Sequence, residues 1–162
     1  MRVSVDVEHK TRVDKVSAQY RKQAKDAVYS GCFKILDIAV TEILRGAKTG
    51  RIYQRGGKSH QASAAGEYPA SDTGNLASNI NVQIHTGGLS GTVESKAAYS
   101  SYLEPSGVEF GTSRSGARPF MQPSAERARP FIRQKFRDLK AKWVYTVGLY
   151  SKRYLPSSMV QA

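Results

Sequence analysis

The stretch that decides the fold runs from residue 10 to residue 44 and reads KTRVDKVSAQYRKQAKDAVYSGCFKILDIAVTEIL. Its apolar residues recur at steps of three to five, which places them on one face of a long helix. These residues are Val13, Val16, Tyr20, Ala24, Ala27, Cys32, Ile35, Ala39 and Ile43. Gly46 follows the last of them and suits a helix C-terminus. Upstream, residues 3–7 alternate between apolar and polar types and predict a short strand.

A second helical pattern covers residues 119–143. Its apolar residues, again at steps of three or four, are Met121, Ala125, Ala128, Ile132, Phe136, Leu139 and Trp143. Pro123 suits a first helical turn, whereas Pro130 lies inside the pattern and predicts a kink or a restart of the helix. Residues 145–162 have no such period, and we expect them to form a C-terminal arm.

The segment between the helices has two parts of different composition. Residues 46–75 are rich in glycine and small polar residues and predict a long loop. Residues 79–85 then alternate, Gly87-Gly88 predicts a hairpin turn, and residues 91–95 predict the returning strand. The sequence therefore predicts an α+β fold with a small antiparallel sheet packed with two long helices. We expect a single domain over residues 1–144, with the arm over 145–162.

Charge is distributed unevenly along the 162 residues, whose net charge is +12. Residues 1–60 carry a net charge of +7, residues 61–110 one of −4, and residues 111–162 one of +9. Basic blocks favour polyanions or an acidic protein partner, which could be the middle block of a neighbouring copy; solvated helix faces are the simpler explanation. No segment approaches the roughly 20 apolar residues of a membrane span.

The sequence contains no complete motif for catalysis. Gly57-Lys58-Ser59 ends like a phosphate-binding loop, but Ile52 stands where that motif needs glycine. His9, His60 and His85 lack metal-ligand spacing, and the single cysteine, Cys32, excludes an intramolecular disulfide. We therefore predict no catalytic residues, no metal site and no cofactor, and hence no enzyme.

Three segments, in this order, carry a resemblance to a known family. The first is KTGRIYQRGG at 48–57, continued by HQASAAGEYPA at 60–70, and the second is DTGNL at 72–76. The third comprises Tyr99, the Tyr-Leu-Glu at 102–104, VEFGT at 108–112 and RPFMQP at 118–123. Across about residues 10–140, the chain resembles the tail-completion or neck family of long-tailed bacteriophages, which join head to tail.

This resemblance implies a structural virion protein that forms a ring, expected to hold six copies, at the head–tail junction. Its partners would be further copies of itself, the tail terminator protein and the head-closure or connector protein, with no membrane involved. It would reside in the host cytoplasm during assembly and then in the virion. The alternative function is that of a basic protein that binds DNA without sequence preference.

The charge pattern and the family resemblance together suggest candidate contact residues. The expected subunit or partner contacts are Arg51, Ile52, Tyr53, Arg55, Tyr68, Glu104, Glu109, Phe110, Arg118 and Phe120. For Phe110, Phe120 and Met121, packing in the core is the competing and favoured interpretation. The expected contacts with DNA in the channel are Arg127, Arg129, Arg133, Lys135, Arg137 and Lys140. Residues 46–71 are expected to become ordered only in the assembled junction.

Overall fold

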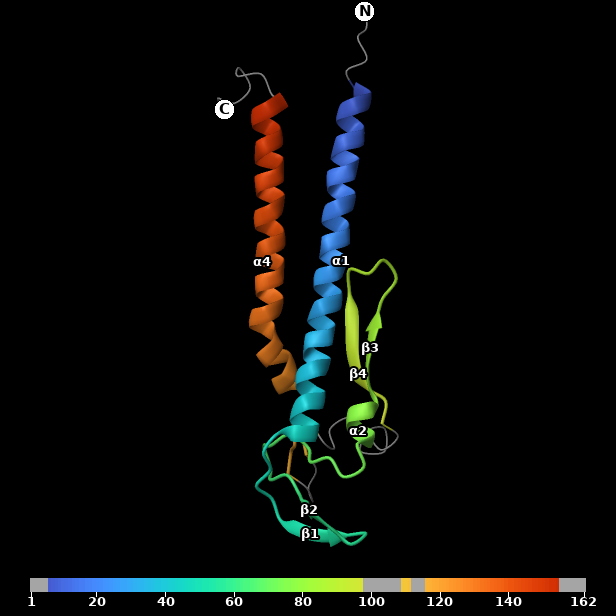
Figure 1. Ribbon diagram of the computed structural model, residues 1–162, viewed down its shortest axis with the longest axis vertical. Helices are drawn as coiled ribbons and strands as arrows, with labels where there is room; N and C mark the ends of the chain where they lie inside the picture. Colours follow the sequence, from blue (N-terminus) through green and yellow to red (C-terminus); the bar gives the residue numbers. More distant parts are fainter. Residues whose placement is uncertain (1–5, 98–108, 112–115, 155–162) are drawn as a thin grey trace, which may run out of the picture.

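Two long helices dominate the computed structural model, which describes residues 6–97, 109–111 and 116–154. Helix α1 spans Asp6–Arg45 and helix α4 spans Met121–Tyr154. They lie side by side and antiparallel, so that the start of α1 and the end of α4 share one end of the molecule (Figure 1). At 1.5 Å per residue, α1 is about 60 Å long. The two helices predicted from hydrophobic periodicity are confirmed.

Both helices are longer than predicted. Residues 6 and 7 already belong to α1, so the predicted strand at 3–7 is wrong there, and residues 1–5 lie outside the described residues. Helix α4 runs on to Tyr154, so the domain boundary expected after residue 144 falls inside a helix. The expected arm over 145–162 therefore begins with helical residues, and the division into a domain and an arm stays a prediction.

Close packing between α1 and α4 depends on small side chains. A Cβ atom on Gly31 would lie 3.2 Å from Cγ1 of Ile132, so the glycine lets α4 approach. Ala27 of α1 and Ala128 of α4 are also buried. Pro130 stands within α4, which is bent near its N-terminal end (Figure 1). The bend follows from the missing N–H and the bulk of the proline ring.

The strands form two separate hairpins rather than one sheet. Strands β3 (Ile80–Ile84) and β4 (Gly91–Ser95) pair antiparallel, as predicted, and lie along α1 (Figure 1). Strands β1 (Ile52–Arg55) and β2 (Lys58–Gln61) form the second hairpin, beyond the C-terminal end of α1. The prediction of an unbroken loop over 46–75 is therefore wrong.

The missed hairpin has a clear sequence signal. Gly56 and Gly57 form its two-residue turn with φ values of 58° and 74°, the left-handed conformation that such turns require. Ile52 is the one aliphatic residue between residues 52 and 61. A half-buried strand is recognised by apolar residues at every second position, and these strands lack that pattern.

The main core lies where the C-terminal end of α1 meets the start of α4, the short helix α2 (Asn75–Ser78) and β3. Its buried residues are Ala39, Ile43, Leu76, Ala77, Ile80, Ala97 and Phe120. The β1–β2 hairpin contributes none of them. The core thus fixes β3–β4 to α1 and leaves β1–β2 to be positioned by other contacts.

Candidate assembly interface

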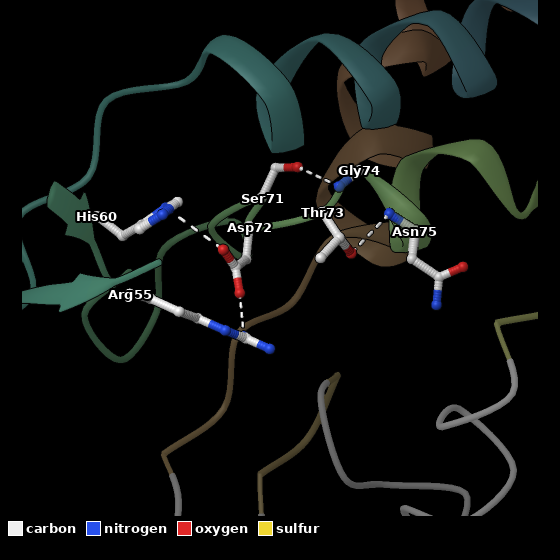
Figure 2. A network of polar contacts seen from close by, with 7 residues as sticks. All are labelled: Arg55, His60, Ser71, Asp72, Thr73, Gly74 and Asn75. Carbon is white, nitrogen blue, oxygen red and sulfur yellow. Dashed lines mark hydrogen bonds and ion pairs between the residues drawn. The ribbon is translucent and has the colours of Figure 1, made fainter. Parts of the chain in front are cut away.

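Polar contacts, rather than apolar packing, fix the β1–β2 hairpin to the rest of the chain. The Asp72 carboxylate accepts a hydrogen bond from Arg55 Nη1 and lies 3.4 Å, through Oδ1, from His60 Nδ1 (Figure 2). Arg55 comes from β1 and His60 from β2, so one carboxylate holds both strands. The rings of Tyr53 and His60 stack with centroids 5.7 Å apart, on the same side of the hairpin.

The residues after Asp72 form a compact turn that leads into α2. Ser71 Oγ accepts a hydrogen bond from the Gly74 N–H at 3.1 Å, and Thr73 Oγ1 accepts one from the Asn75 N–H at 3.4 Å (Figure 2). Gly74 is the N-cap residue of α2. The segment from Ser71 to Asn75 therefore joins two elements: the carboxylate of Asp72 holds the hairpin, and the hydroxyls of Ser71 and Thr73 shape the start of α2.

A second carboxylate closes the base of the same region. Glu67 accepts hydrogen bonds from the Thr49 hydroxyl at 2.5 Å and from the backbone N–H groups of Thr49 and Ala64. These donors, the Thr49 hydroxyl first, hold the pKa of the Glu67 carboxyl below its usual value. The carboxylate ties residues on both sides of the hairpin into one closed loop.

Several residues proposed as partner contacts are used inside the chain instead. Phe120 is 5% exposed and belongs to the core. Tyr68 packs against that core, and its hydroxyl lies 3.2 Å from Ser124 Oγ. Arg118 donates to the carbonyl of Ser63 through Nε and Nη2, each at 3.2 Å. Tyr68, Arg118 and Phe120 therefore position the loop, and core packing is confirmed for Phe120.

Glu109 caps the start of α4. Its carboxylate accepts hydrogen bonds from the backbone N–H groups of Phe120, Met121 and Gln122, at 2.8 to 3.1 Å. These are among the N–H groups that a helix leaves unpaired at its N-terminus, where negative charge is favourable. Phe110, the next residue, is 66% exposed, so core packing is wrong for it. Glu104 lies outside the described residues.

Four of the ten predicted contact residues are exposed, and these are Arg51, Ile52, Arg55 and Phe110. The structure brings Arg51, Ile52, Tyr53 and Arg55 together on one hairpin, as expected from their neighbouring positions. Arg55, however, pairs with Asp72 of the same chain rather than standing free.

The six predicted DNA contacts divide into two groups. Arg127 donates to Glu42 Oε1 of α1 at 2.7 Å, which raises the pKa of its guanidinium, and Lys135 lies over the Phe131 ring. The other four are exposed at spacings of three and four residues, which places them along one side of α4. This basic row consists of Arg129, Arg133, Arg137 and Lys140. Phe136, predicted in the core, is exposed.

Sequence reasoning missed an apolar row on α1. Tyr29, Phe33 and Leu44 are exposed, although the two aromatic rings contact each other in a tilted arrangement, with centroids 4.4 Å apart. Leu36 and Val40 lie between them along the helix; they are partly buried and pack against the main core. The sequence does contain a pattern for this row, since the apolar positions 29, 33, 36, 40 and 44 repeat at helical spacing. This second row was missed because the sequence analysis assigned the apolar residues of the helix to a single face.

Within the described residues, no group of three His, Cys, Asp or Glu side chains could hold a metal ion. No helix of that part of the chain is long and apolar enough to cross a membrane. Cys32 is buried against β4, and burial raises the pKa of its thiol.

The structure is thus a pair of long helices with a projecting β1–β2 hairpin and an apolar row on α1 that is partly exposed. Residues 8–105 match the family model of the bacteriophage HK97 gp10-like tail component. The chain belongs to this family, and it is therefore a structural component of a bacteriophage tail and a head–tail joining protein. The family is one of virion structural proteins and not of enzymes. No curated protein and no solved structure matches the chain.

Proposed function

We propose that the protein forms a ring, with six copies, at the head–tail junction, where it completes the tail and joins it to the head connector. Its partners are further copies of itself, the tail terminator and the head-closure protein. It assembles in the host cytoplasm and then resides in the virion. The observation that carries this proposal is the exposure of large apolar side chains, with Tyr29, Ile52 and Phe110 at 54%, 63% and 66%. Exposed apolar groups of this kind mark contact surfaces.

The acids of the middle block that the structure describes already have partners within the chain. Asp72 pairs with Arg55, Glu94 pairs with Lys96, and Glu67 and Glu109 each accept two or more backbone N–H groups. The remaining acid of the block, Glu104, lies outside the described residues. Pairing of basic and acidic blocks between copies is therefore a weaker basis for a ring than apolar contact.

A direct test uses the full chain alone and with the tail terminator and head-closure proteins. Light scattering over a range of concentrations gives the mass, and negative-stain images give the shape. We expect a closed ring, alone or in the presence of a partner. A chain that stays monomeric under all of these conditions would contradict the proposal.

The basic row supports a second candidate function, contact with packaged DNA. Four cations on one side of α4 could bind phosphates without reading bases. Binding to two unrelated duplexes should be equal and should weaken steeply with salt. In Arg133→Gln/Arg137→Gln, the salt slope should fall by about one per lost phosphate contact. Lys58→Gln, at the tip of the hairpin, is the control. A preference for one duplex would count against this function.

A further inference from the structure

The β1–β2 hairpin has one face without any charged side chain. Ile52 and Gln54 of β1 pair with Gln61 and Ser59 of β2, and all four side chains are exposed. Because side chains alternate along a strand, this face is opposite to the one that carries Arg55 and His60. Figure 2 shows Arg55 and His60 in contact with Asp72, so the uncharged face is the one turned away from that contact.

The apolar row of α1 is a second uncharged surface. Its five residues cover about four turns of the helix, and they are Tyr29, Phe33, Leu36, Val40 and Leu44. The sides of α1 beside the row are already covered: Gly31 faces Ile132 of α4, and Cys32 faces Gly91 of β4. Asp37 borders the row, and its charge is balanced by Lys34 at 2.9 Å.

The hairpin face is uncovered within its own chain, and the row is covered only in its middle, where Leu36 and Val40 pack against the main core. Ile52 and the ends of the row stay largely exposed, although a two-stranded hairpin is marginal in water unless it packs against something else. A second observation limits what can cover them. Each copy carries a net charge of +12, so contact between copies is least unfavourable where both surfaces lack charge.

We propose that the uncharged face of the β1–β2 hairpin of one copy packs on the apolar row of α1 of the next copy. Two different surfaces of the same chain make this a head-to-tail contact, the kind that closes into a ring. The inference rests on the proposed ring and names the surfaces that build it. Asp72 acts as a positioning residue, because it fixes the orientation in which the hairpin meets the neighbour.

The test places a photo-crosslinking amino acid at position 52 of the full chain and mixes it with an isotope-labelled copy under ring-forming conditions. We expect crosslinks from position 52 to residues 29–44 of a different copy. Crosslinks only within one copy, to other regions, or to the tail terminator would overturn the inference. If a ring forms but its crosslinks map elsewhere, the proposed function survives and this inference fails. If no ring forms, both fail.

Substitutions provide an independent measurement. Ile52→Glu and Phe33→Glu should each weaken self-association by about tenfold or more, since each buries a charge in the contact. Leu89→Glu is the matched control, because Leu89 is an exposed aliphatic residue in the β3–β4 turn. Circular dichroism should report the same helix content for all three variants. Equal self-association of the three variants, with the helix content retained, would contradict the proposal.

Discussion

The two hairpins of this protein have the same topology and opposite relations to the core. The β3–β4 hairpin buries Ile80 in the main core and lies along α1. The β1–β2 hairpin buries no apolar residue there, and Asp72 holds it through charged and polar groups. Apolar contact makes the first hairpin part of the fold. Polar attachment leaves the apolar side chain of the second available to another molecule.

The largest expected effect compares one isoleucine from each hairpin. Ile80→Ala should lower the free energy of unfolding by about 2–5 kcal/mol, because it leaves a cavity in a packed core. Ile52→Ala should change it by no more than about 0.5 kcal/mol, since the side chain is mostly in water. Chemical denaturation of both variants measures the difference. Equal losses would mean that both hairpins belong to the core.

Thiol reactivity sharpens the same comparison. Cys32 is buried against Gly91 of β4, and its raised pKa lowers the fraction of reactive thiolate. In Ile52→Cys, the new thiol should react with iodoacetamide about tenfold or more faster than Cys32 at neutral pH. Labelling followed by peptide mass spectrometry separates the two sites. Similar rates would show that the β3–β4 contact with α1 opens readily.

A smaller effect is expected from the acid that holds the β1–β2 hairpin. Asp72→Asn should speed amide exchange in residues 52–61 by up to roughly fivefold, the equivalent of about 1 kcal/mol for an ion pair in which Arg55 is exposed and Asp72 is partly buried. Exchange in residues 80–95 should not change. Asp37→Asn, which breaks the surface pair with Lys34, is the control and should leave both hairpins unaffected. Unchanged exchange at 52–61 in Asp72→Asn would rule out the proposed role of Asp72.

The smallest effect concerns pH. Hydrogen bonds hold the pKa of Glu67 below its usual value of about 4.3. Its stabilisation is therefore complete above that value and is lost as the pH falls through the lowered pKa. Below about pH 4, the Thr49 and Ala64 amides should exchange faster relative to their intrinsic rates, while those of β3 should not. Glu67→Gln should remove this dependence on pH, and its persistence would assign the titration to another group.

The sequence predicted the elements that bury an apolar face, because burial imposes a period that can be read. Both helices and the β3–β4 hairpin carry such a period, as the core residues Ile43 and Ile80 show. Prediction from the sequence failed for the segments whose position is set by polar contacts. The pairing of Asp72 with Arg55 joins residues 17 apart, and Glu109 caps α4 from 11 residues before Phe120, so that no local pattern shows either contact. The end of α4 was missed for a related reason, since its last turns show no apolar period.

The central claim is that the β1–β2 hairpin is presented for assembly while the β3–β4 hairpin belongs to the fold. Hydrogen exchange measured by mass spectrometry on the free chain and on the assembled ring tests it most directly. We predict that protection rises on assembly at residues 52–61 and 29–44 and stays constant at 80–95. The claim would be contradicted if residues 52–61 exchanged equally fast in both states, or if the new protection appeared at 80–95 instead.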